Sequence, residues 1–155
     1  MRRLIASGAA LAAVLLTAGP AAAQSGQAMS DEDAIEYRRA VFEVIAGNFK
    51  PMGAMVEGKI DYDAERFARN AERVAALSRM ALEGFEGGPH AGETESLDAI
   101  WDEWEKFQQG MQQFQEQAQG LASAAEGGAG MSQVRGPFVE VADTCKGCHD
   151  NFREE

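Results

Sequence analysis

Four stretches of this 155-residue chain repeat apolar residues at spacings of three and four, and turn-forming residues separate them. Such spacing puts the apolar side chains on one face of a helix, and no stretch alternates convincingly as a strand would. The helices are expected from Ser30 to a turn at 58–61, from Asp63 to about Gly84, from 94–96 to 127–128, and over 134–152. Four amphipathic helices with short loops predict an all-α fold, an antiparallel four-helix bundle.

Local signals refine the ends of these helices. Ser30 is a good N-cap, and the acidic residues 31–33 after it oppose the dipole of the first helix. Pro51 falls inside the first helical pattern and is expected to kink it. The pair at 136–137, Gly-Pro, is expected to delay the start of the last helix.

The first residues do not follow the helical pattern of the bundle. A basic start at 1–3 precedes an apolar stretch over 4–18, and small residues at 21–23 precede Gln24. This order is typical of a secretory signal peptide. A membrane anchor is the alternative, but the apolar stretch is shorter than the roughly 20 residues that a span needs. The sequence predicts that residues 1–23 are removed after Ala23, leaving 24–155 as one exported domain.

The composition is strongly acidic, with 14 basic and 25 acidic side chains and a formal net charge of −11. Cleavage would remove Arg2 and Arg3 and make the charge two units more negative. Such a surface disfavours nucleic acid and anionic lipid, and it favours a basic protein as a redox partner if there is one. Beyond the signal peptide, no segment is apolar and long enough to span a membrane.

The only two cysteines, Cys145 and Cys148, are followed at once by His149. Cys-x-x-Cys-His is the attachment motif for one covalent haem c, with the histidine as axial iron ligand. On a helix these positions share a face, so both thiols reach one side of a porphyrin while the imidazole points at the iron. A disulfide, a zinc site and a chance match are the alternatives. The first would not need His149, and zinc would need more ligands than His90 can add.

The motif stands close to the end of the chain, with six residues after His149. Any sixth iron ligand must therefore come from upstream. In an antiparallel bundle the first helix can face the last across the haem, which places Phe42 on the distal side. Phenylalanine cannot bind iron. Met52 and Met55 lie about 15–20 Å further along that helix, at 1.5 Å per residue.

The chain resembles the cytochromes c′, the class II c-type cytochromes. The resemblance covers essentially the whole sequence after the signal peptide. The segments that carry it are 34–39 (AIEYRR), 58–64 (GKIDYDA), 93–101 (ETESLDAIW) and 145–153 (CKGCHDNFR). It implies a periplasmic, usually homodimeric four-helix bundle with a five-coordinate haem on the C-terminal helix, which binds NO and CO and usually excludes O2.

The resemblance also implies roles for individual residues. Arg38 and Arg39 match positions beside the haem propionates, although the second is commonly Gln in the family. Glu93 and Thr94 match the loop at the haem edge, and Trp101 matches a tryptophan of the pocket and core. Low-spin relatives place Met where Phe42 stands here, so this chain resembles the five-coordinate branch. Arg153 matches a basic residue of the proximal pocket, placed to contact a proximally bound NO.

Three functional hypotheses follow from the sequence. The leading one is a gas-binding haem protein in which Phe42 crowds the distal side and offers bound O2 no hydrogen bond. The second is an electron carrier of the low-spin class II type, with a Met or Lys50 as sixth ligand. The third is an enzyme such as a peroxidase. It is disfavoured because no distal acid–base histidine lies near Phe42.

Overall fold

In the computed structural model, residues 29–154 are described. The expected signal peptide and its cleavage site lie outside this range. The helices, in chain order, are α1 (Asp31–Val56), α2 (Ala64–Ser78), the short 3-10 helix η1 (Glu83–Phe85), α3 (Ala99–Asp102), α4 (Trp104–Ala125), the 3-10 helix η2 (Glu126–Gly128) and α5 (Met131–Phe152). Within this range the only β-pairing is an isolated antiparallel bridge between Ser96 and Arg153.

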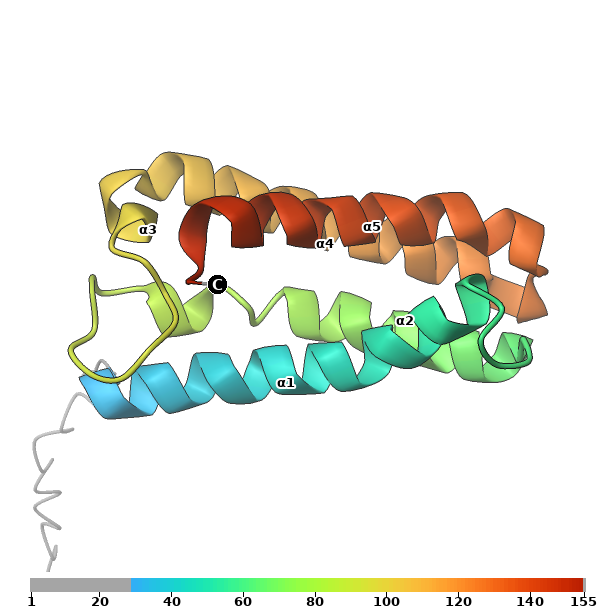
Figure 1. The fold of residues 1–155 in the computed structure, drawn as a ribbon, viewed down its shortest axis with the longest axis horizontal. Coiled ribbons are helices and arrows are strands. Elements are labelled where there is room, and N and C mark those ends of the chain that lie inside the picture. Colours follow the sequence, from blue (N-terminus) through green and yellow to red (C-terminus); the bar gives the residue numbers. More distant parts are fainter. Residues whose placement is uncertain (1–28, 155) are drawn as a thin grey trace, which may run out of the picture.

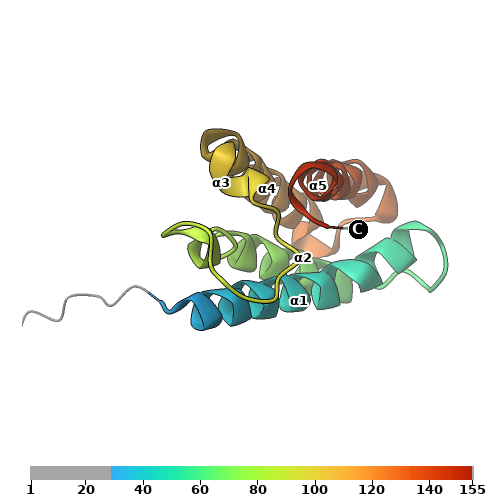
Figure 2. The same ribbon diagram turned by 60° about the vertical axis from the view of Figure 1, so that its left-hand side comes forward.

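The four long helices form the predicted antiparallel four-helix bundle (Figure 1). Helix α2 packs against both α1 and α4, and α4 also packs against α5. Figure 2 shows α1 and α2 as one layer and α4 and α5 as the other. The C-terminus returns to the end of the bundle where α1 begins, so the residues after the motif lie near the first turns of α1 (Figure 1).

The first two helices begin where their capping residues predict. Ser30 accepts a hydrogen bond from the backbone N–H of Asp33, at 3.2 Å, and Asp63 accepts one from that of Arg66, at 2.9 Å. Both side chains satisfy a backbone donor that lacks a partner within its helix. Helix α2 ends at Ser78, earlier than predicted. The chain then passes through turns into η1, which keeps Phe85 in the core.

The third helix differs most from the prediction, which started it at 94–96. Here the chain is not helical, because Leu97 donates its N–H to the carbonyl of Phe152 and the carbonyl of Glu95 accepts from the N–H of Glu154. Backbone groups engaged in this pairing are not available to a first helical turn. A four-residue helix, α3, follows, and Glu103 (φ −116°, ψ 40°) separates it from α4.

Two prolines lie inside helices, and neither of them ends its helix. Helix α1 continues through Pro51 to Val56, and α5 begins at Met131, before Pro137. The prediction that 136–137 delays the last helix is therefore wrong. Gln133 helps this early start by accepting the N–H of Gly130 at 2.9 Å.

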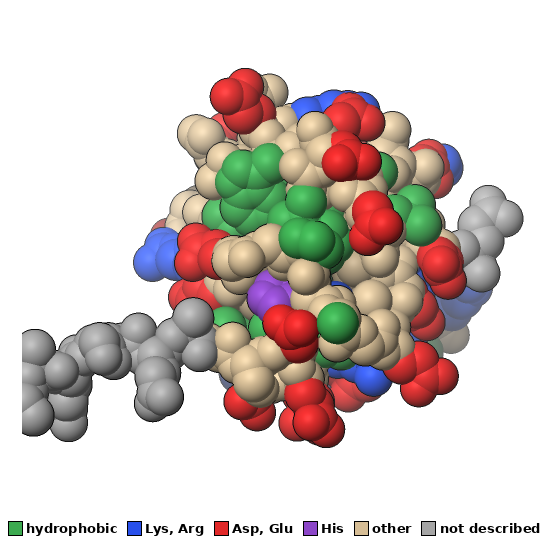
Figure 3. All heavy atoms as spheres, turned by 90° about the vertical axis from the view of Figure 1, so that its left-hand side faces the viewer, with side chains coloured by type: hydrophobic (Ala, Val, Ile, Leu, Met, Phe, Trp, Pro, Cys, Tyr) green, Lys and Arg blue, Asp and Glu red, His purple; other side chains and the backbone are tan. Residues whose placement is uncertain are grey.

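Aromatic residues fill much of the core between the helices. Phe67 and Phe107 are fully buried, and Phe49 of α1 stacks on Phe138 of α5 at 4.4 Å between ring centroids. Figure 3 shows the end of the bundle near α3, where acidic side chains surround smaller apolar areas. No helix in the described part of the chain combines the length and the apolar character that crossing a membrane requires.

Candidate functional site

A cavity of about 560 Å³ lies among α1, α4 and α5, and the loop before α3 also lines it. Its walls are mostly apolar, and they become charged where the loop and the C-terminal residues meet α1. Side chains that are far apart in sequence line the cavity together, since Arg38 of the first helix and Arg153 after the last helix both lie on its wall. Only the antiparallel arrangement of α1 and α5 makes this possible.

Cys145, Cys148 and His149 all line this cavity from α5. Both cysteines are free thiols and half-buried. Burial raises the pKa of both, that of Cys148 to about 11, with a further contribution from the neighbouring Cys145. At neutral pH the two thiols are therefore protonated, and they are far less prone to chance oxidation than exposed thiolates.

His149 lies in a mixed electrostatic environment. The cavity walls desolvate the imidazole and lower its pKa, and the charge of Arg153 lowers it further. Asp150 and Glu95 act in the opposite direction. The net result is a pKa below the usual value, so the ring is neutral at neutral pH. Neutral imidazole is the form that binds metal ions.

Arg38 is buried, although it carries a charge. Its guanidinium donates hydrogen bonds to the carbonyl of Gly84 (3.2 Å) and the hydroxyl of Thr94 (2.8 Å), and lies 3.3 Å from Nδ1 of His90. The backbone of Gly84 comes this close because it has no side chain: a Cβ there would lie 2.7 Å from that of Arg38. Burial, then the charge of Arg39, lowers the pKa of Arg38. The guanidinium also lies 5.1 Å from the ring centroid of Phe85.

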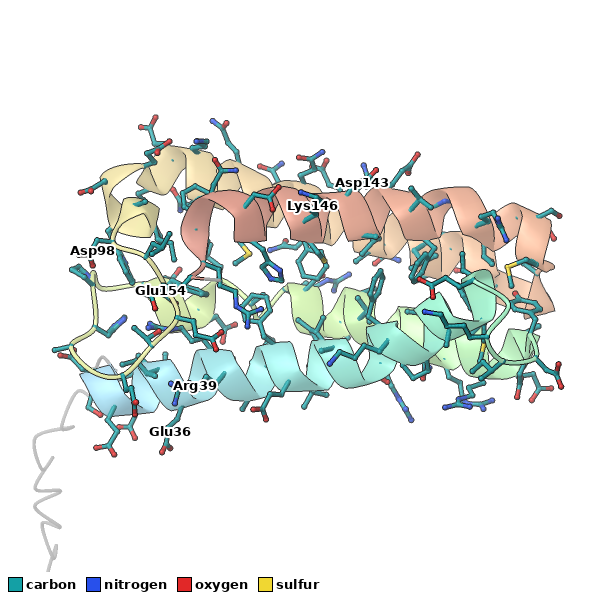
Figure 4. All side chains as sticks on the ribbon, in the orientation of Figure 1. Glu36, Arg39, Asp98, Asp143, Lys146 and Glu154 are labelled. Carbon is teal, nitrogen blue, oxygen red and sulfur yellow. The ribbon has the colours of Figure 1, made fainter. Side chains whose placement is uncertain are left out.

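Arg39 and the loop at 93–94 meet at the mouth of the cavity. Arg39 donates to the carbonyl oxygen of Glu93 at 2.6 Å. Thr94 lines the cavity, whereas the side chain of Glu93 is not part of its wall. The structure thus brings Arg38, Arg39 and Thr94 together, and it places Glu93 next to them through its backbone. Figure 4 shows Arg39 at the same end of the bundle as Glu154.

Phe42 and Trp101 occupy different places. Phe42 lines the cavity from α1 and packs edge-on against Phe85, with centroids 6.2 Å apart. Trp101 is not part of the cavity wall. Its indole N–H donates to the carbonyl of Phe85 at 3.0 Å, so Trp101 helps to hold Phe85, which does line the cavity.

Arg153 lines the cavity at the end of α5, where the sequence placed a proximal basic residue. Its guanidinium forms an ion pair with Glu95, with Nε at 2.8 Å and Nη2 at 2.5 Å from the same carboxylate oxygen. Glu95 was not expected at the site. It lies in the segment 93–101 that resembles the family, but nothing in the sequence pairs it with Arg153, because the contact depends on the loop folding back onto the C-terminus.

Other wall residues were expected only as core. These are Ile45, Phe49, Ile100, Phe107, Met111, Phe114 and Phe152. Helical periodicity identifies them as inward-facing but does not separate a packed core from a cavity wall.

Two lysines occupy different positions relative to the cavity. Lys50 of α1 lines it, whereas Lys146 projects from the side of α5 away from α1 (Figure 4).

Comparison with known proteins decides the family. The family model for cytochrome C′ matches residues 33–153. The chain belongs to the cytochrome c′ family. It is 40% identical over 129 residues to a cytochrome c′ from Halomonas halodenitrificans, covering 80% of this chain and 98% of that protein.

Solved structures of cytochromes c′ agree with this assignment. The chain is similar to cytochrome c′ from Shewanella frigidimarina, with a TM-score of 0.78 and 42% identity, covering 81% of this chain and 98% of the other. It is also similar to the nitrosyl complex of a variant of cytochrome c′ from Alcaligenes xylosoxidans, with a TM-score of 0.75 and 30% identity, covering 83% and 100%.

Proteins of the cytochrome c′ family carry covalent haem c, and the cavity fits such a group. The only two cysteines lie one helical turn apart on its wall, both reduced, with His149 next to them. The apolar side chains of α1 and α4 offer contacts for a porphyrin. The arginines at the mouth offer donors for its carboxylates.

Proposed function

We propose that this cytochrome c′ binds one haem c in the cavity, through thioethers to Cys145 and Cys148 and with His149 as axial ligand, and that it takes up NO and CO. The observation that carries the proposal is that these three side chains line one cavity, whose α1 wall carries the apolar residues Phe42, Ile45, Ala46 and Phe49. When bound, the haem iron supplies a one-electron couple and a coordination position for a diatomic gas.

The residues at the cavity mouth orient the haem. Arg38 is held by Thr94 and the carbonyl of Gly84, so its guanidinium is fixed before a propionate arrives. A pre-organised, charged donor loses little side-chain entropy on binding a carboxylate. Arg39 lies nearer solvent and adds a second positive charge at the same edge.

Phe42 controls the side of the cavity formed by α1. The neighbouring wall residues on that helix, Ile45, Ala46 and Phe49, are apolar as well. These four side chains provide no hydrogen-bond donor to a bound gas. Oxygen depends on such a donor more than CO or NO does, so the wall favours the latter two. The nitrosyl complex of the Alcaligenes xylosoxidans relative supports the uptake of NO.

The expected export signal and the family suggest where and how this protein works. We propose a periplasmic location, with the signal peptide cleaved after Ala23, and a homodimeric assembly. Amino-terminal sequencing of the mature protein tests the first statement, and analytical ultracentrifugation tests the second. Any redox partner is expected to present a basic surface to this acidic chain.

A second candidate function is electron transfer by a six-coordinate haem. Met111 and Lys50 favour it, because both line the cavity and carry atoms that can bind iron. Met52 and Met55, by contrast, are buried in the core and are not part of the cavity wall. A ligand from Met111 would come from α4, not from α1 as in the low-spin relatives.

The ferrous absorption and resonance Raman spectra of the haem-loaded protein distinguish the two candidates. A five-coordinate high-spin spectrum that changes on addition of CO or NO is expected. A six-coordinate low-spin spectrum would favour electron transfer instead. In that case a Met111→Leu variant should become five-coordinate if Met111 is the sixth ligand, and a Lys50→Gln variant tests the other side chain.

A further inference from the structure

The loop segment 93–97 connects two parts of the site that are far apart in sequence. Toward α1, the carbonyl of Glu93 accepts from Arg39, and the hydroxyl of Thr94 accepts from Arg38. Toward the C-terminus, the carbonyl of Glu95 accepts from the N–H of Glu154 at 2.8 Å. Leu97 donates its own N–H to the carbonyl of Phe152 at 3.0 Å. The segment therefore joins the arginines of the cavity mouth to the end of the helix that carries His149.

Glu95 is the charged residue at the centre of this segment. Two nitrogens of Arg153 contact one of its carboxylate oxygens, at 2.8 and 2.5 Å. Both side chains and His149 line the same cavity. Asp150, three residues before Arg153, pairs with Lys146 instead. Glu95 is thus the acidic side chain that fixes the orientation of Arg153.

This ion pair contributes little to stability. The side chain of Arg153 is 49% exposed and that of Glu95 is 64% exposed. Water and salt screen exposed ion pairs of this kind, so they add little to the free energy of unfolding. The pair nevertheless lies close to His149: the backbone N–H of Arg153 donates to the carbonyl of His149 at 3.2 Å, and Glu95, His149 and Arg153 all line the cavity. The pair therefore affects the position of the Arg153 charge relative to the imidazole of His149 more than it affects the stability of the bundle.

We propose that Glu95 is a positioning residue of the proximal pocket: its ion pair holds the guanidinium of Arg153 beside His149, so that segment 93–97 sets the charge around the axial imidazole. This inference rests on the proposed function only in taking His149 as the axial ligand. It holds equally for a gas-binding protein and for an electron carrier.

A double-mutant cycle tests the proposal on the haem-loaded protein. The variants are Glu95→Ala, Arg153→Ala and their combination, and the readout is the equilibrium constant for one-electron reduction. Removing a negative charge favours the reduced iron in any background. Release of Arg153 from His149 opposes that gain, and it occurs only when Arg153 is present. Glu95→Ala should therefore raise the equilibrium constant for reduction in both backgrounds, but by different factors. The factor in the wild-type background should be about two- to fivefold smaller than the factor in the Arg153→Ala background.

Glu57→Ala is the matched control, since Glu57 is an exposed carboxylate paired with Lys59 at the opposite end of α1. It should change the equilibrium constant equally with and without Arg153. If Glu95→Ala also gives equal factors in the two backgrounds, Glu95 acts only as a charge and the proposal is overturned.

Proton–nitrogen NMR gives a readout that is independent of gas binding. In the ferrous protein under CO, the iron is diamagnetic whether CO or a protein side chain is the sixth ligand. The Nε–H of Arg153 should exchange slowly in the wild type and in Glu57→Ala, and it should be lost to exchange in Glu95→Ala. Persistence of the slow signal in Glu95→Ala would overturn the proposal without affecting the assignment of the haem site.

Discussion

Replacing Arg38 by Met should destabilise the haem-loaded protein by about 2–4 kcal/mol. Arg38 is 3% exposed, and its charged guanidinium donates to the carbonyl of Gly84 and the hydroxyl of Thr94. Hydrogen bonds to charged groups contribute about 1.5–3 kcal/mol each. The cost of burying the charge offsets part of this sum. Methionine nearly preserves the volume, so the change removes the hydrogen bonds rather than opening a large cavity.

Urea unfolding at neutral pH, followed by circular dichroism, measures this loss. With an m-value of about 2 kcal/mol/M, the midpoint should fall by roughly 1–2 M. Arg39→Met is the control. Arg39 is exposed and makes one hydrogen bond, to the carbonyl of Glu93, so its loss should cost less than about 1 kcal/mol. Equal midpoints for the two variants would refute the idea that Arg38 anchors the loop to α1.

Three further predictions concern the cavity and the caps. Phe42→Ala should speed CO binding about two- to tenfold, as measured by flash photolysis. In the wild type a ligand must displace the ring from its rotamer, at a cost of about 0.5–1.5 kcal/mol, and the variant has no such cost. An unchanged rate would show that Phe42 does not obstruct the distal side of the haem. In the haem-free protein, iodoacetamide should label Cys148 slowly at pH 8 and faster up to pH 11, since a pKa raised to about 11 leaves little thiolate below it; rapid labelling at pH 8 would contradict this. Asp63→Ala should cost about 1 kcal/mol of unfolding free energy by removing the N-cap of α2, and no change in the urea midpoint would show that the cap contributes nothing.

The bundle could be predicted because its signals are local. Apolar spacing gives each long helix, and Ser30 and Asp63 mark two of the starts. The Cys-x-x-Cys-His motif likewise needs only one helical turn to place its three side chains together. These features depend on residues that are close together in the sequence, so the sequence of this one chain is enough to predict them.

The loop from 93 to 97 could not be predicted in the same way. Its backbone pairs with partners in 152–154, and the sequence of the loop alone looks like the start of a helix. The pairing of Glu95 with Arg153 depends on that contact between distant parts of the chain. Similarly, the helical pattern that includes Phe107 and Met111 does not distinguish the wall of a cavity from a closed core.

The central claim is that His149 is the single protein ligand to the iron of a covalently attached haem. The ferrous resonance Raman spectrum of the purified, haem-loaded protein, recorded with and without NO, tests it most directly. The account predicts a five-coordinate high-spin iron with an iron–histidine stretching band, and a spectrum that changes when NO is added. A six-coordinate low-spin spectrum that NO leaves unchanged would contradict it.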